Sequence, residues 1–123
     1  MKLAPRTRPR KAAPPSLPMG RDRPHVLELL ARHAADAGIS TSEAMRQLLV
    51  QFSQEPGAAA REPASIAGSW ERPLEGRWSR LVCPHHPHLP DTVRRQARQA
   101  GITTPEYIRR AVRRFLREQG HVV

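Results

Sequence analysis

The stretch PHVLELLARHAADAGISTSEAMRQLLVQFSQEPG, residues 24–57, has a second version later in the chain, PHLPDTVRRQARQAGITTPEYIRRAVRRFLREQG, residues 87–120. The two stretches align without a gap, and thirteen of the aligned positions are identical. An internal repeat defines the unit of architecture before any other inference. A unit of this size buries too little apolar surface to be stable alone. We therefore expect the two copies to pack together, either within one chain or across a homodimer.

Each copy has the pattern of two helices joined by a glycine turn. Apolar residues recur at spacings of three and four, which is the period of one helix face. Gly38 and Gly101 stand just past the first helix of each copy, where a left-handed residue is usual. The expected helices span residues 24–37, 41–54, 88–100 and 104–118.

Capping boxes mark the start of the second helix in each copy. Ser40 and Thr103 are the expected N-caps. Glu43 and Glu106 follow three residues later, where a carboxylate can reach back to a backbone N–H. The repeat therefore predicts two well-defined helix N-termini.

Positive charge is distributed unevenly along the chain. The 123 residues carry a net charge of +10, which indicates a polyanionic partner, nucleic acid first and an anionic membrane surface second. Residues 1–23 and 77–123 are strongly basic, whereas residues 24–55 have two arginines against four acids. Residues 1–15 read as a disordered basic arm, and the proline- and glycine-containing residues 56–76 read as a linker.

Composition also limits the cellular setting. Cys83 is the single cysteine, so no disulfide can form within the chain, and this fits a reducing, cytoplasmic location. No apolar run approaches the roughly 20 residues of a membrane-spanning helix. We expect a protein that does not span a membrane.

The segment Cys83-Pro84-His85-His86-Pro87-His88 contains potential metal ligands. Thiolate and imidazole bind zinc or nickel well, but the spacing matches no standard zinc finger and the prolines limit convergence of the ligands. A solvated loop is the favoured interpretation, and a metal site is the alternative. A nucleophilic cysteine would need a low-pKa setting, which the nearby histidines could supply, but the sequence offers no oxyanion hole and no carboxylate partner. We expect no cofactor and no catalysis.

The repeated pattern resembles the ribbon-helix-helix family of DNA-binding proteins, the Arc-type repressors and their relatives in plasmid control and conjugation. The residues that carry the resemblance are Gly38-Ile39-Ser40-Thr41-Ser42-Glu43 with Arg46 and Phe52, and their counterparts Gly101-Ile102-Thr103-Thr104-Pro105-Glu106 with Arg109 and Phe115. The resemblance implies a short strand before each helix pair. Two such strands form an antiparallel ribbon that enters the DNA major groove. It further implies that the N-terminus of each second helix holds a phosphate. The expected fold is mainly α, with tandem units at residues 16–55 and 77–120.

Counting back from the first helices places the expected strands at Leu17–Arg23 and Arg80–His86. Trp78–Cys83 is the better second strand by composition. One register directs Arg21 and Arg23 towards the groove, and the other directs Gly20 and Asp22 there; we favour the first register on charge grounds. The candidate DNA-binding residues are Arg21, Arg23 and Arg80 in the strands, Thr41, Ser42 and Thr104 at the helix N-termini, and Arg6, Arg8 and Arg10 in the arm.

The resemblance and the charge favour a DNA-binding protein without catalysis. Its partner would be double-stranded DNA, and its role that of a transcriptional repressor or of an accessory factor at a plasmid or phage site. The alternative is a protein-interaction module whose basic helices dock on an acidic partner such as a toxin, a relaxase or a nuclease. The arginines of residues 109–117 suit either a solvated helix face or a phosphate or acidic partner: Arg109, Arg110, Arg113, Arg114 and Arg117.

Overall fold

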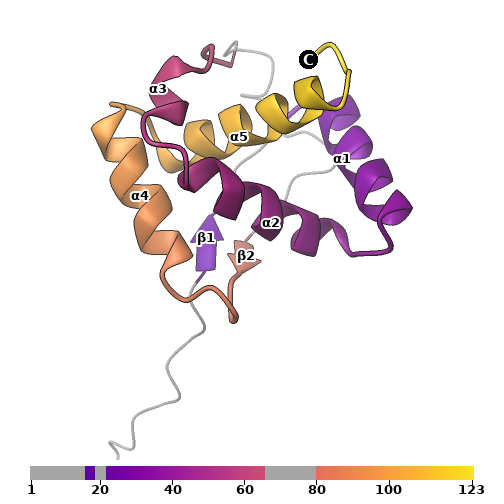
Figure 1. Cartoon of the computed structure of the whole chain (residues 1–123), viewed down its shortest axis with the longest axis horizontal. Coiled ribbons are helices and arrows are strands. Elements are labelled where there is room, and N and C mark those ends of the chain that lie inside the picture. Colours follow the sequence, from indigo (N-terminus) through magenta and orange to yellow (C-terminus); the bar gives the residue numbers. More distant parts are fainter. Residues whose placement is uncertain (1–15, 19–21, 66–79) are drawn as a thin grey trace, which may run out of the picture.

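The computed structural model describes residues 16–18, 22–65 and 80–123, which are mainly helical with one small two-stranded sheet (Figure 1). The predicted mainly helical class is therefore confirmed. The element order is β1 (Ser16–Pro18), α1 (Pro24–Asp36), α2 (Thr41–Ser53), α3 (Ala58–Arg61), β2 (Arg80–Val82), α4 (Leu89–Gln99) and α5 (Thr104–Glu118). The predicted basic arm, with Arg6, Arg8 and Arg10, lies outside the described residues, as does Arg21.

The first helix of each helix pair ends at a glycine in the same way. Gly38 has φ +74° and Gly101 has φ +73°, a left-handed conformation that costs glycine little. The residues after these glycines donate back into the helix, Ile39 N–H to the Ala34 carbonyl and Ile102 N–H to the Ala97 carbonyl, each at 3.0 Å. This is a Schellman motif, so the predicted helix ends are confirmed.

The N-caps of α2 and α5 are also as predicted, but the glutamates behave differently. Ser40 Oγ accepts from Glu43 N–H at 3.0 Å, and Thr103 Oγ1 accepts from Glu106 N–H at 3.2 Å. The Glu43 carboxylate was expected to reach back to the cap. It instead accepts from Arg46 at 3.0 Å, because that guanidinium lies one turn ahead on the same helix face.

The strands β1 and β2 pair antiparallel, with Leu17 opposite Leu81. Both leucines are buried in the core, which also receives side chains from all five helices. The prediction that β1 continues to Arg23 is wrong. The nearly buried Asp22 carboxylate accepts from Arg23 N–H at 2.7 Å and from Arg113 at 2.6 Å, which draws this segment into the start of α1.

The strand β2 likewise ends early. The prediction placed its end at His86, but a turn begins after Val82, with His86 N–H donating to the Cys83 carbonyl at 3.3 Å. Proline at position 84 lacks the N–H that a longer ladder would need. Within the described part of the chain, each strand has three residues.

The centre of the molecule is the contact between α2 and α5 (Figure 1). The ring centroids of Phe52 and Tyr107 are 5.2 Å apart in an edge-on arrangement. Tyr107 is fully buried, and its hydroxyl donates to Gln96 Oε1 on α4 at 2.6 Å. This hydrogen bond satisfies the one polar atom that the buried side chain brings into the core.

The predicted linker contains a short helix that the sequence analysis missed. Gly57 has φ +74° and precedes α3, whose Ala58 and Ala59 are buried. Alanines between prolines and glycines lack a periodic pattern, so only their burial against α2 and α5 reveals that this part of the segment is packed.

Candidate nucleic-acid interface

The strand pair has one face in the core and one face in solvent. Leu17 and Leu81 point inward, so by the period of two their neighbours in the strands point outward. Arg80 is exposed and Val82 is 39% exposed on the outward face. The Arg80 guanidinium donates across the pair to Ser16 Oγ at 2.9 Å. The outward face thus combines a cation, a hydroxyl and an aliphatic side chain.

Two helix arginines hold the strand pair from outside. Arg46 on α2 donates to the Val82 carbonyl at 2.6 Å, and Arg94 on α4 donates to the Ser16 carbonyl at 3.0 Å. Edge strands present backbone carbonyls without ladder partners. These two contacts supply donors to such carbonyls, and they fix the strands relative to the helices.

The helices α2 and α5 begin on opposite sides of the molecule (Figure 1). At the start of α2, Thr41 is half-buried and Ser42 is exposed; at the start of α5, Thr104 is half-buried. The first N–H groups of a helix lack intrahelical partners and attract anions. The three predicted phosphate-binding residues therefore do occupy two separate helix N-termini, as expected.

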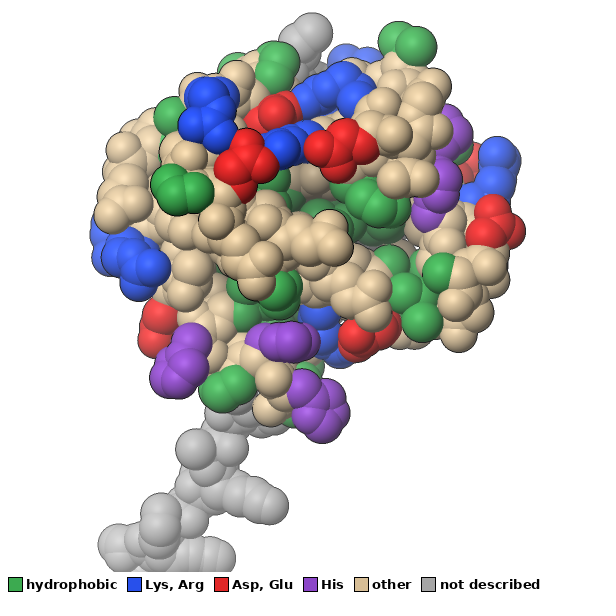
Figure 2. Space-filling model, in the orientation of Figure 1, with side chains coloured by type: hydrophobic (Ala, Val, Ile, Leu, Met, Phe, Trp, Pro, Cys, Tyr) green, Lys and Arg blue, Asp and Glu red, His purple; other side chains and the backbone are tan. Residues whose placement is uncertain are grey.

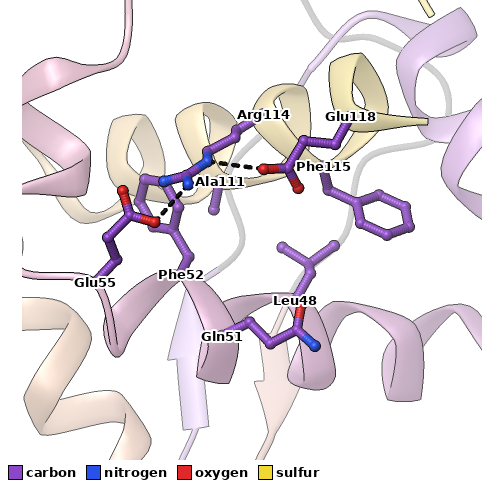
Figure 3. A pocket seen from close by; sticks show the side chains of 8 residues that line it. All are labelled: Leu48, Gln51, Phe52, Glu55, Ala111, Arg114, Phe115 and Glu118. Carbon is purple, nitrogen blue, oxygen red and sulfur yellow. Dashed lines mark hydrogen bonds and ion pairs between the residues drawn. The ribbon is translucent and has the colours of Figure 1, made fainter. Parts of the chain in front are cut away.

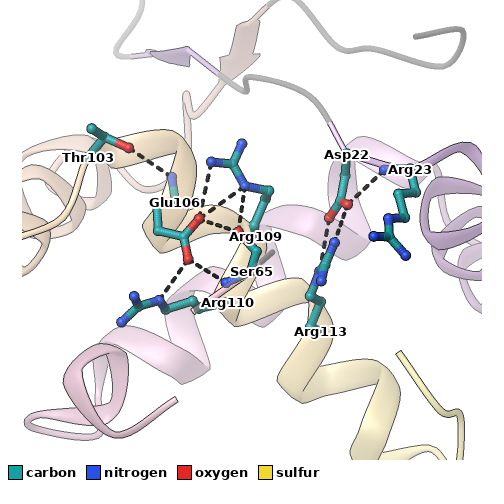
Figure 4. A network of polar contacts seen from close by, with 8 residues as sticks. All are labelled: Asp22, Arg23, Ser65, Thr103, Glu106, Arg109, Arg110 and Arg113. Atoms are coloured by element: carbon teal, nitrogen blue, oxygen red, sulfur yellow. Dashed lines mark hydrogen bonds and ion pairs between the residues drawn. The ribbon is translucent and has the colours of Figure 1, made fainter. Parts of the chain in front are cut away.

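The start of α5 makes a contact that has no counterpart at the start of α2 among the described residues. Ser65 donates to the Glu106 carboxylate through its N–H, at 2.8 Å, and through its hydroxyl (Figure 4). Burial of Glu106 opposes ionisation, but the hydrogen bonds from Ser65 and Arg110 and the charge of Arg109 outweigh it and lower the pKa of this carboxyl. The hydrogen bond from Arg46 lowers the pKa of Glu43 at the start of α2.

Two of the three arginines predicted to read bases are among the described residues, and of these two Arg80 lies in a strand. Arg23 is the N-cap residue of α1 and is half-buried. The expected alternation along the first strand therefore does not reach residue 23.

The arginines of α5 form ion pairs with carboxylates of the same chain. Arg109 and Arg110 bind Glu106, and Arg113 binds Asp22, with side chains that are 12% and 5% exposed in the last pair (Figure 4). The remaining two pair with glutamates from the turn after α2, from the residue after α3 and from α5 itself: Arg114 with Glu55, Glu62 and Glu118, and Arg117 with Glu62. The sequence analysis did not predict that the α5 arginines form ion pairs within the chain. The excess of acidic residues in 24–55 was the signal that could have indicated these partners.

A cavity of about 170 Å³ lies where α2 and α5 cross, and its lining follows the sequence repeat (Figure 3). Arg114 spans it, with its guanidinium 5.7 Å from the centre of the Phe52 ring. The hydrogen bond that Arg114 donates to the Glu55 carboxylate raises the pKa of Arg114 and favours its charged form. The lining residues are four aligned pairs: Leu48 and Ala111, Gln51 and Arg114, Phe52 and Phe115, Glu55 and Glu118.

The segment with potential metal ligands does not converge on a point. Cys83 is fully buried, its Sγ lies 3.7 Å from the Leu81 carbonyl, and burial raises the pKa of the thiol. His85 and His88 are exposed, and Figure 2 shows histidines spread over the end of the molecule where β2 leads into α4. Within residues 16–18, 22–65 and 80–123, no group of three or more His, Cys, Asp or Glu residues is placed to hold a metal ion.

None of the described helices has the length and apolar character needed to cross a membrane. Comparison of the chain with protein-family models, with curated proteins and with solved structures finds no match.

Proposed function

We propose that this chain binds double-stranded DNA without catalysis, as a tandem ribbon-helix-helix protein with both units in one chain. The observation that carries the proposal is the antiparallel pairing of β1 with β2, which brings together the segments before the two helix pairs. Two antiparallel strands have the width that the DNA major groove admits. The outward face of this ribbon would meet base edges, with Arg80 as its cation.

The helix termini support the same docking. The first turns of α2 and α5, at Thr41, Ser42 and Thr104, would each bind a phosphate beside the groove through backbone N–H groups. The basic arm, with Arg6, Arg8 and Arg10, would add phosphate contacts. A repressor or an accessory factor at a plasmid or phage site fits this kind of binding.

Two observations favour DNA over the protein-interaction alternative. The α5 arginines, which were to meet an acidic protein, are paired with carboxylates of this chain. The strand pair, in contrast, keeps the exposed cation Arg80 on its outward face. The pairing of β1 with β2 inside one chain also favours an intrachain pseudo-dimer over a homodimer.

Fluorescence anisotropy with unrelated duplexes tests the proposal. Affinity should fall by about 10³-fold or more between about 50 and 200 mM salt if six or more phosphates are contacted. Absence of binding at the lower salt concentration would exclude the proposal.

Selection of preferred sequences from a random duplex pool tests the ribbon. Arg80→Ala should relax the preference at one or two base pairs, since an arginine that reads guanine discriminates by about 1–3 kcal/mol. Arg61→Ala, on α3 at the far side of the molecule from the strand pair (Figure 1), is the matched control and should leave the preference unchanged. An identical preference for Arg80→Ala and wild type would show that the ribbon does not read bases.

A further inference from the structure

The helix α4 carries three arginines, and the first of them contacts the strand pair. Arg94 reaches the Ser16 carbonyl at 3.0 Å, and Arg80 contacts the hydroxyl of the same serine at 2.9 Å. Arg98 lies four residues after Arg94, so the two share one helix face. Arg95 and Arg98 are exposed. We name Arg94, Arg95 and Arg98 the α4 arginine face.

This face differs from the arginines of α5 in how its charge is used. Among the described residues, neither Arg95 nor Arg98 forms a salt bridge, and Arg94 lies 3.6 Å from the exposed Asp91. Like charges three or four residues apart on a helix destabilise it by about 0.2–0.5 kcal/mol per pair. The chain therefore keeps the charges of Arg95 and Arg98 outside the salt bridges of the described residues, at a small cost in helix stability.

Along the chain, Arg98 lies between two elements that we propose to contact DNA. One turn before it, Arg94 contacts β1; just after it, the turn at Gly101 leads to Thr103, the N-cap of α5. The surface thus runs from the ribbon's outward face along α4 towards the start of α5. The spacing of charges along a helix face suits successive phosphates of a backbone better than a single small anion.

The corresponding surface of α1 is different. The sequence repeat aligns Arg94 with Ala31 and Arg98 with Ala35, and both alanines are exposed. Only Arg95 has a basic counterpart, Arg32. The helices α4 and α1, which lie on opposite sides of the molecule in Figure 1, therefore offer unequal positive charge to a duplex.

We propose that the α4 arginine face binds the sugar-phosphate backbone of duplex DNA beside the groove that the ribbon enters. It adds at least one phosphate contact on the α4 side, through Arg98, that the α1 side lacks. The complex is then asymmetric, and the protein docks on its site in one orientation. This inference rests on the DNA-binding function proposed above and specifies the geometry of that binding.

Salt titrations of single variants on one duplex of about 20 base pairs, two helical turns, provide the test. Arg98→Ala should weaken binding about fivefold near 0.15 M salt and reduce the slope of log K against log salt by about 0.9. Arg98→Lys keeps the charge and should bind within about twofold of wild type. Arg61→Ala removes an exposed arginine from α3 and should leave the slope unchanged.

The outcomes separate this inference from the proposed function. An unchanged slope for Arg98→Ala, with wild type binding the duplex, would overturn the α4 contact and leave the ribbon in place. An equal loss for Arg98→Ala and Arg61→Ala would also overturn it, because the effect would then follow net charge alone. Failure of the wild type to bind would instead remove the function on which the contact depends.

Discussion

The two halves of the molecule, residues 16–65 and 80–123, share a sequence pattern but carry opposite charges where they meet. The helix α5 presents arginines to Asp22, Glu55 and Glu62 of the first half. The aligned residues in α2 and at its C-cap are uncharged: Val50 for Arg113, Gln51 for Arg114 and Gln54 for Arg117. A pair made of two first halves would bring acidic residues together without these arginines. A pair made of two second halves would bring arginines together without these acidic residues. We therefore expect the charges to favour the pairing of a first half with a second half over either pairing of identical halves.

The largest effect is expected at the buried pair between Asp22 and Arg113. Asp22→Ala leaves the Arg113 guanidinium without this carboxylate in a site where both side chains are nearly buried. The free energy of unfolding should fall by about 3 kcal/mol or more, measured by urea denaturation.

The double variant Asp22→Ala with Arg113→Met is the control for this pair. Removal of both charges should restore part of the lost stability, because the buried cation is then removed together with its carboxylate. A single variant within about 0.5 kcal/mol of wild type would show that this pair does not hold the halves together.

A second effect is a loss of stability at alkaline pH, caused by ionisation of Tyr107. This residue distinguishes the second half from the first, where Ala44 stands at the aligned position. Burial raises the pKa of Tyr107 to about 12, from its ordinary value of 10.0. The unfolded chain therefore loses its tyrosine proton first as the pH rises. The stability that this group contributes is complete below about pH 10 and is lost as the pH approaches 12, by about 2 kcal/mol.

The chain has one tyrosine, so tyrosinate absorbance reports this group directly. Tyr107→Phe removes the alkaline loss while keeping the ring against Phe52, and it serves as the control. A phenol that titrates near pH 10 in the folded protein would contradict its burial in the second half.

The smallest effect is expected at the cavity between α2 and α5. Arg114→Gln gives α5 the residue that α2 has at the aligned position, and it removes the cation shared by Glu55 and Glu118. The urea midpoint should fall less than for Asp22→Ala, since these groups are partly exposed to solvent.

Adding Gln51→Arg to this variant returns an arginine to the same cavity from the opposite helix. Both glutamates line the cavity, so the double variant should recover part of the midpoint. A midpoint for Arg114→Gln equal to that of wild type would show that charge at this crossing does not favour the pairing of unlike halves.

Local sequence signals predicted the helices well. The Schellman glycines and the Ser40 and Thr103 caps act within a few residues, so the four long helices begin and end within one residue of their expected limits. The predicted strand limits were wrong at Asp22 and Arg23, where a distant residue takes part: Asp22 lies outside the strand and binds Arg113. Nothing within residues 16–24 indicates that partner.

The same reasoning applies to the candidate interface. The outward position of Arg80 followed from charge and strand pattern, and the helix N-termini followed from the caps. The ion pairs of the α5 arginines could not be predicted in this way, because the carboxylates that they bind come from segments up to 91 residues away in sequence. Sequence periodicity identifies the face of a helix but not the element that covers it.

The central claim is that β1 and β2 of one chain form a single antiparallel ribbon. Isotope-filtered NMR on a mixture of labelled and unlabelled protein tests it through cross-strand NOEs between Leu17 and Leu81. The account predicts these NOEs within a single labelled chain and none between labelled and unlabelled chains. Their absence, or their appearance only between chains, would contradict it.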